Sequence, residues 1–140
     1  MTAQPTAPYP FGDLPEGTVT FLFTDIEGST QLLYRLGDQF AATLAEHHRI
    51  LREAVAHGGG HVVGTEGDSF FVAFPRATNA VAAAVEAQRA LAQYPWPEGA
   101  PVRVRMGLHT GEAEKALDSY VGIAVHRAAR IAHVLSLIHI

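Results

Sequence analysis

Two aspartates stand where a pair of carboxylates could bind a metal ion. Asp25 directly follows an apolar, β-branched run, and Asp68 lies in the turn between two further runs of that kind. Two carboxylates ~4 Å apart repel by about 4 kcal/mol at an effective dielectric constant of about 20, so such a pair needs a proton or a cation. Oxygen ligands suit Mg²⁺ or Mn²⁺. The plainer interpretation is that Asp25 caps a helix and Asp68 shapes a turn.

The spacing of apolar residues predicts the elements that would carry these aspartates. We expect a strand at 18–24, one long or two consecutive helices at 31–57 with a break at Gly37 and an end at 58–60, a hairpin of strands 61–65 and 69–74, a helix at 77–94, a strand at 102–108, a loop at 111–119 and a helix at 120–135. This βαββαβα order predicts an α/β (α+β) protein with a ferredoxin-like βαββαβ core, in which helices pack on an antiparallel sheet.

The expected topology brings the two aspartates to one end of the sheet. In a ferredoxin-like sheet, the second strand of the hairpin lies antiparallel beside the first strand of the fold. Asp25 ends the first strand, and Asp68 begins the neighbour that runs the other way. The shared end favours a metal site over two unrelated polar residues.

Other polar and apolar residues receive structural roles. In the helix at 77–94, the side chains Val81, Val85, Gln88 and Leu91 fall near one face, which we expect to pack. Arg103 and Arg105 alternate with apolar residues and are expected to point to solvent. We assign no chemistry to the adjacent pair His47 and His48.

Composition favours one globular domain with flanking tails. A chain of 140 residues with 48% hydrophobic content can bury a single core. We expect a flexible Pro/Gly-rich tail at 1–17, the domain at 18–135 and an atypical tail at 136–140. The net charge of -4 without a basic stripe argues against direct nucleic acid binding, and cysteine is absent. No run approaches the ~20 apolar residues of a membrane segment, so we expect a cytoplasmic protein.

The turn after the first strand is suited to phosphate groups. Glu27, Gly28, Ser29 and Thr30 form a glycine-containing turn that opens the next helix. Backbone N–H groups at a helix N-terminus can receive phosphate oxygens. Beside a pair of metal-binding carboxylates, this turn predicts a nucleoside triphosphate ligand.

Four ordered motifs make the chain resemble the class III adenylate and guanylate cyclase domain family from about residue 17 to residue 134. They read VTFLFTDIEGST (19–30), TEGDSFFVAF (65–74), VRVRMGLHTGE (102–112) and YVGIAVHRAARIA (120–132). The resemblance implies that Asp25, Asp68 and the carbonyl of Ile26 bind Mg²⁺ or Mn²⁺. It also implies that the ribose 3′-hydroxyl attacks the α-phosphorus, which yields a 3′,5′-cyclic nucleotide and pyrophosphate.

The resemblance assigns further positions in the family's site. It implies that Arg130 stabilises charge on the α-phosphate and that His126 stands where the family places a ribose-orienting Asn. Gly64 replaces the lysine that reads the base, and Ser119, beside Asp118, replaces its partner aspartate. We therefore expect poor purine selectivity. The ending SLIHI departs from the family, so we also expect a truncated C-terminus.

Two hypotheses for function follow from these matches and departures. The first is a metal-dependent nucleotidyl cyclase in cyclic-nucleotide signalling, acting on ATP or another nucleoside triphosphate as a homodimer whose active sites are shared between chains. The alternative is a catalytically weak or inactive module for nucleotide sensing or dimerisation. Gly64, Ser119, His126 and the short C-terminus motivate the alternative.

Overall fold

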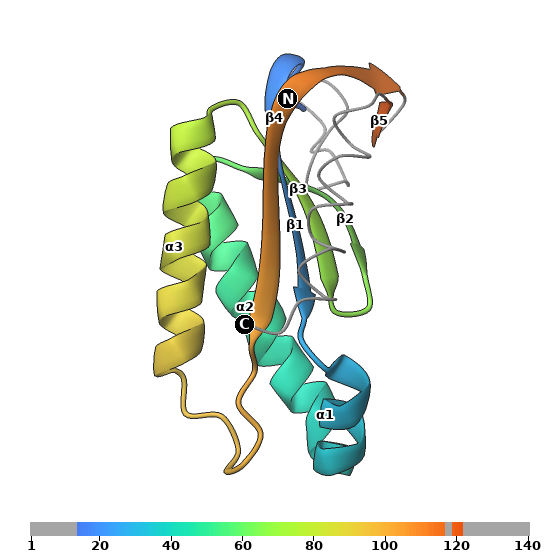
Figure 1. Ribbon diagram of the computed structural model, residues 1–140, viewed down its shortest axis with the longest axis vertical. Helices are drawn as coiled ribbons and strands as arrows, with labels where there is room; N and C mark the ends of the chain where they lie inside the picture. Colours follow the sequence, from blue (N-terminus) through green and yellow to red (C-terminus); the bar gives the residue numbers. More distant parts are fainter. Residues whose placement is uncertain (1–13, 117–118, 122–140) are drawn as a thin grey trace, which may run out of the picture.

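A five-stranded antiparallel sheet forms the middle of the molecule (Figure 1). The computed structural model describes residues 14–116 and 119–121. Its elements in chain order are β1 (Gly17–Ile26), α1 (Ser29–Leu36), the 3-10 helix η2 (Gly37–Gln39), α2 (Phe40–His57), β2 (His61–Glu66), β3 (Ser69–Phe74), α3 (Ala77–Gln93), β4 (Val104–Ala116) and β5 (Ser119–Val121). The strand order is β2-β3-β1-β4-β5. No helix in this described part is both long and apolar enough to cross a membrane.

Strand β1 lies at the centre because its apolar run can be buried on both faces. It pairs antiparallel with β3 on one side and with β4 on the other, so Phe23 lies opposite both Phe71 and Gly107. The hairpin of β2 and β3 thus places its second strand beside β1, as the sequence predicts. The expected antiparallel sheet with packed helices is confirmed.

Helices α2 and α3 cover one face of the sheet (Figure 1). Successive side chains of a strand point to opposite faces, and on this face β1 contributes Leu22 and Ile26. The β3 side chains Phe70, Val72 and Phe74 join them. The helices supply the buried residues Ile50, Leu51, Ala54, Val55, Ala80, Ala83, Ala87 and Leu91. Burial of one such large side chain stabilises the fold by about 1.5–3 kcal/mol.

The opposite face of the sheet, which we call the open face, carries a smaller and more aromatic cluster. Val19, Phe21 and Phe23 of β1 belong to it, and among the described residues no helical side chain joins this cluster. The rings of Phe23 and Phe71 stack with centroids 4.4 Å apart. Tyr120 of β5 adds an edge contact to Phe21, and its hydroxyl donates a hydrogen bond of 2.6 Å to the Pro15 carbonyl. Residues 14 and 15 therefore contact the sheet.

Glycines mark the ends of the first two helices. Gly37, the first residue of η2, has a φ of 55° and lies between α1 and α2, which confirms the predicted break. The end of α2 is followed by Gly58, Gly59 and Gly60. A Cβ atom at Gly60 would lie only 2.6 Å from Cε2 of Phe74. The turn after α2 therefore needs a glycine so that the chain can pass close to the core.

Two sequence-based expectations for the second half are wrong. The predicted loop at 111–119 is a strand up to Ala116, because β4 continues along β1 and pairs Ala113 with Gly17. Tyr120 and Val121 lie in β5 rather than in a helix, since they pair with Lys115 and Glu114. The rest of the helix expected at 120–135 lies outside the described residues.

Helix α3 packs on the core with a face that only partly matches the expected one, since Leu91 is buried as expected but Val81 and Val85 are not. Its buried residues are Ala80, Ala83, Ala87 and Leu91, whereas Val81 and Val85 are 52% and 43% exposed. Three alanines form most of the buried face, and a methyl side chain lets a helix lie close to its neighbours. Helical spacing shows which residues share a face, but when two faces are apolar it does not decide which one packs.

Candidate functional site

Asp25 and Asp68 lie at the same end of the sheet. Asp25 is the second-last residue of β1, and Asp68 directly precedes β3. The backbone N–H of Ile26 donates a hydrogen bond of 2.7 Å to Oδ2 of Asp68, so this carboxylate is held next to the end of β1. The antiparallel pairing of β1 with β3 therefore brings the Asp68 carboxylate to the residue that follows Asp25.

Asp25 already has a cationic partner. Arg105 lies directly opposite it in β4, and its Nε donates a hydrogen bond of 2.8 Å to Oδ1 of Asp25. This bond raises the pKa of the Arg105 guanidinium, and the charges of Asp25, Glu27 and Asp68 add to that rise, while partial burial opposes it. The expectation that Arg105 points to solvent is wrong, because its register places it against a carboxylate. The side chain is only 20% exposed.

The turn after β1 leaves backbone N–H groups open to a ligand. Gly28 caps α1 in the left-handed conformation with a φ of 64°, and no side chain caps the helix. The first turn of α1 contains no acidic residue that would repel an anion. The Glu27 N–H donates to the Arg103 carbonyl at 2.7 Å, which fastens the turn to the segment before β4. An uncapped N-terminus of this kind favours an anionic group.

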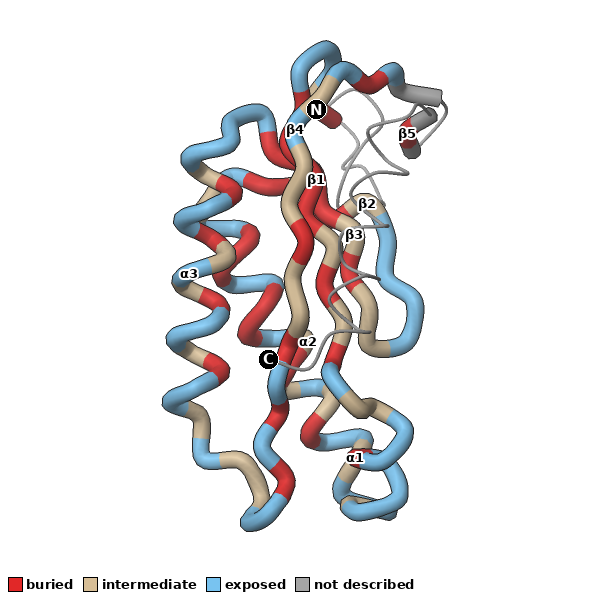
Figure 2. The backbone as a smooth tube through the Cα atoms, viewed as in Figure 1, coloured by how far each residue is buried: buried red, intermediate tan, exposed pale blue. Residues whose placement is uncertain are grey.

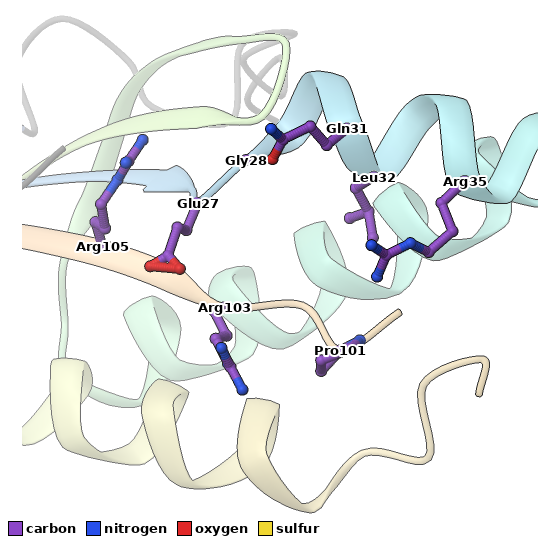
Figure 3. A pocket seen from close by; sticks show the side chains of 8 residues that line it. All are labelled: Glu27, Gly28, Gln31, Leu32, Arg35, Pro101, Arg103 and Arg105. Carbon is purple, nitrogen blue, oxygen red and sulfur yellow. The ribbon is translucent and has the colours of Figure 1, made fainter. Parts of the chain in front are cut away.

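A cavity of about 400 Å³ opens beside this turn (Figure 3). Its walls come from the start of α1 and from the segment that leads into β4. The lining residues are Glu27, Gly28, Gln31, Leu32, Arg35, Pro101, Arg103 and Arg105. Arg35 is held in place by a hydrogen bond to the Gly99 carbonyl. With three guanidinium groups and one carboxylate in its wall, the cavity suits an anionic ligand.

A second cavity, of about 270 Å³, is lined by residues of β1, β2 and β3 around Gly64. Its lining includes the rings of Phe23 and Phe71 together with Gly64 and Thr65. A Cβ atom added at Gly64 would meet nothing within 4 Å, so the position has room for a side chain. The cavity offers an aromatic surface and, at Gly64, no polar side chain.

Comparison with known proteins places this geometry in a family. The model of the adenylate and guanylate cyclase catalytic domain matches residues 14–124. The chain belongs to this family. An uncharacterised protein of Mycobacterium tuberculosis is 40% identical over 119 residues, which cover 84% of this chain and 39% of that protein. An adenylate cyclase of Lachancea kluyveri is 34% identical over 86% of this chain and 8% of its own length.

A solved structure shares the fold of this cyclase domain. An adenylate cyclase from Trypanosoma brucei, solved in its monomeric state, superposes with a TM-score of 0.76 at 27% identity. The match covers 90% of this chain and 70% of that chain. The chain spans about two fifths of the length of the mycobacterial relative and a smaller part of the fungal one.

The donor set at the end of β1 fits a Mg²⁺ type of ligation. Within residues 14–116 and 119–121, no group of three or more His, Asp or Glu side chains could hold a metal ion. The ligand set predicted from the resemblance, Asp25, Asp68 and the carbonyl of Ile26, comes from residues that the pairing of β1 with β3 brings to one end of the sheet. Mg²⁺ commonly uses one or two carboxylates and completes its shell with waters and substrate phosphates, so this small set is compatible with it.

Several predicted site residues are not brought together in the described structure. His126 and Arg130 lie outside the described residues, as does Asp118. Ser119 begins β5, where its backbone pairs with Ala116. These positions remain predictions from the family resemblance.

One residue of the histidine pair of α2, a pair to which the sequence assigned no role, contacts the turn that carries Asp68. His48 Nε2 donates a hydrogen bond of 3.1 Å to the Gly67 carbonyl. His47 is fully buried, and neither of its ring nitrogens has a hydrogen-bond partner in the described structure. Burial, with the nearby His48, lowers the pKa of His47 to about 4. Two adjacent histidines on a helix gave no periodic signal for a contact with a distant turn.

Proposed function

We propose that this cyclase domain converts ATP, or another nucleoside triphosphate, to a 3′,5′-cyclic nucleotide and pyrophosphate. The observation that carries the proposal is the fixed position of Asp68 at the end of β1, beside Asp25 and an uncapped helix N-terminus. Carboxylates for a metal ion, N–H groups for phosphates and a cavity lined by arginines thus lie within one end of the sheet. This combination suits phosphoryl transfer, where positioning and charge stabilisation supply most of the catalysis.

The residues divide into metal-holding and phosphate-binding groups. Asp25, Asp68 and the Ile26 carbonyl would hold Mg²⁺ or Mn²⁺, which supplies Lewis-acid activation of the ribose 3′-hydroxyl and neutralises phosphate charge. The turn from Glu27 to Thr30 receives triphosphate oxygens through its N–H groups. This arrangement binds the nucleotide with its phosphates toward the 400 Å³ cavity.

The family resemblance supplies the remaining catalytic residues. Arg130 stabilises the negative charge that builds on the α-phosphate, and His126 contacts the ribose. An arginine suits the first role because its planar fork matches two phosphate oxygens. Both residues lie outside the described part of the chain, so their placement rests on the motif alone.

Base selectivity is expected to be poor in this proposal. The aromatic cavity around Gly64 binds a purine by stacking on Phe23 or Phe71, and stacking does not distinguish adenine from guanine. Neither Gly64 nor Ser119 supplies the charged side chain of the family pattern. A competition assay with ATP and GTP measures this: similar kcat/KM values are expected, and a strong preference for ATP contradicts the proposal. Gly64→Lys should sharpen the preference, because the position has room for a side chain.

Metal dependence gives the direct test of the proposal. The purified protein, with any flanking sequence that its gene encodes, should form a cyclic nucleotide only when Mn²⁺ or Mg²⁺ is present. Asp25→Ala should reduce turnover by orders of magnitude and leave the fold intact. Asp38→Ala is the matched control, since Asp38 is an exposed carboxylate in η2 and should retain full activity. Turnover in excess EDTA, or an unaltered rate for Asp25→Ala, refutes the proposal.

We further propose that the protein is cytoplasmic and forms a homodimer. The resemblance implies that the active sites of this dimer are shared between its chains. A two-fold symmetric dimer offers the metal half of each chain to the arginine half of the other. Mixing inactive Asp25→Ala chains with inactive Arg130→Ala chains should then restore about half of the sites in each heterodimer, because one site collects both defects and the other neither. Heterodimers that form but stay inactive contradict shared sites.

The second candidate function is a module that binds nucleotide without turning it over. The absence of a polar side chain at Gly64 favours it, because this position supplies no side-chain donor to the base where the family pattern has a lysine. The two functions differ in a simple measurement. Nucleotide binding by calorimetry together with no cyclic product, in the protein with all its flanking sequence and Mn²⁺, identifies the sensing module.

A further inference from the structure

The ion pair of Asp25 and Arg105 is built into the sheet. The two residues lie directly opposite each other in the β1 and β4 register. Both side chains are partly shielded, with 31% and 20% exposed, and Nε to Oδ1 measures 2.8 Å. Arg105 leaves β4 beside the end of β1 (Figure 3). The backbone therefore delivers the guanidinium to the carboxylate without help from a flexible loop.

The surroundings of Arg105 are acidic. Asp25 accepts the hydrogen bond from its Nε, Glu27 lines the same cavity, and the Asp68 carboxylate is held by the N–H of the residue that follows Asp25. A cluster of carboxylates at a sheet end needs a counter-ion, because like charges a few ångströms apart repel. Arg105, through its ion pair with Asp25, places a positive charge at this end of the sheet.

We propose that Arg105 is the resident counter-ion of this site and competes with the divalent metal for Oδ1 of Asp25. The proposal rests on the metal-holding role of Asp25 under the proposed function. A metal ion that uses Oδ1 must first break the hydrogen bond from Arg105, so the pair weakens metal binding in the nucleotide-free protein. Arg105 is thus a positioning residue, which acts through Asp25 and lowers the metal affinity.

Arg103 provides a matched control for this inference. It lies two residues before Arg105 and lines the same cavity. Its backbone carbonyl accepts the Glu27 N–H, but in the described structure its side chain makes no ion pair with a carboxylate. Replacing Arg103 removes the same charge from the same region and leaves the Asp25 contact intact. The pair of variants therefore separates direct competition from a general loss of positive charge.

The test is Mn²⁺ binding to the nucleotide-free chain, measured by electron paramagnetic resonance. A half-buried pair of this kind is worth about 1 kcal/mol, so Arg105→Gln should tighten Mn²⁺ binding roughly 3- to 10-fold. Arg103→Gln should change the affinity less than about 2-fold, because exposed charges are screened. Circular dichroism and thermal melting check that each variant is folded.

Several outcomes overturn the inference. A folded Arg105→Gln that binds Mn²⁺ as the wild type does, or more weakly, contradicts competition. Equal tightening by Arg103→Gln assigns the effect to general charge and also contradicts it. If the wild type binds Mn²⁺ and Asp25→Ala does not weaken that binding, the proposed metal site itself fails, which differs from a failure of Arg105 alone.

A measurement on the unmutated chain covers the case in which Arg105→Gln does not fold. The Nε–H of Arg105 can be followed by nuclear magnetic resonance during a titration with Mg²⁺. Competition predicts that this signal shifts and exchanges faster with solvent as Mg²⁺ saturates the site, because its hydrogen bond to Asp25 is lost. A signal that stays fixed at saturating Mg²⁺ overturns the proposal.

Discussion

The two faces of the sheet receive alternate residues of the same strand, and these residues have different roles on each face. On β1, Leu22 and Ile26 enter the core beneath the helices, while Phe21, Phe23 and Asp25 belong to the open face. Figure 2 shows the buried positions concentrated along β1 and the inner sides of α2 and α3. The helix-covered face contributes stability, and the open face ends in the carboxylate and guanidinium of the candidate site. Strand alternation thus lets one strand serve both roles.

The largest expected difference between the faces concerns the two phenylalanines of β3 and β1. Phe74 is fully buried beneath the helices, so Phe74→Ala should lower the free energy of unfolding by about 3–5 kcal/mol. Phe23 is only partly buried on the open face, so Phe23→Ala should cost about 1–2 kcal/mol. Denaturation with urea, compared at constant m-value, measures both. Equal losses would show that the open face is as much a core as the covered one.

Acid should weaken the covered face through His47. Its pKa of about 4 lies below the ordinary value of 6.5, so the stabilisation from the neutral ring is complete above about pH 6.5 and is lost as the pH falls toward 4. The loss should reach about 3 kcal/mol at pH 4, by about 1.4 kcal/mol for each unit of pKa. Burial is the main cause of this low pKa of His47, and the neighbouring His48 adds to it.

The variant His47→Leu isolates this acid effect. Leucine is an apolar side chain of similar size that cannot take up a proton. The stability of the variant should therefore fall less than that of the wild type between pH 7 and pH 4. Thermal melts across this range give the comparison. Parallel curves for the two proteins would assign the acid sensitivity to other groups.

Substitutions at two glycines, one near each face of the sheet, should give smaller differences in stability. Gly60→Ala places a methyl group 2.6 Å from the Phe74 ring and should destabilise by about 1–3 kcal/mol through overpacking. Gly64→Ala meets no atom within 4 Å and should change the stability by less than about 0.5 kcal/mol. The difference between their melting temperatures is the measurement. A large loss at Gly64 would mean that the cavity there is closed in solution.

The smallest effect is expected on the outer side of α3. Val81 and Val85 are about half exposed, so Val81→Gln and Val85→Gln should each change the stability by less than about 0.5 kcal/mol. Ala83→Gln, on the buried side of the same helix, serves as the contrast and should be strongly destabilising. Comparable losses of stability at Val81 and Ala83 would show that the face of α3 expected from the sequence also packs against the core.

Short sequence patterns predicted most of the helices, strands and turns, because these elements depend on the conformational preferences of neighbouring residues. The β-branched run of β1, the turn between β2 and β3 and the break at Gly37 all follow from short-range rules. The full length of β4 did not follow, since Gly111 and the charged residues up to Lys115 read as a loop, although pairing with β1 and β5 holds them as a strand. Tertiary pairing overrode local propensity there.

The candidate site was predictable only as far as topology reaches. Antiparallel pairing of β1 and β3 was enough to expect Asp25 and Asp68 at one end of the sheet. The contact between Asp25 and Arg105 depends on the exact β1 and β4 register, which an alternating pattern does not determine. The hydrogen bond from His48 to the Gly67 carbonyl depends on how α2 packs over the hairpin turn, and the spacing of residues in the sequence does not indicate that packing.

The central place of β1 also has a consequence for synthesis on the ribosome. β1 is translated before either of its partners, and its Thr20 finally meets Thr110, 90 residues later in the chain. At about 5–20 residues per second, roughly 5 to 18 seconds pass before that partner is made. Strand β3 is made earlier, so during the later part of this interval the apolar run TVTFLFT lacks a partner on the edge that faces β4. An unpaired apolar edge of this kind promotes aggregation. The edge of β1 that faces β4 is therefore the one that is exposed longest during synthesis.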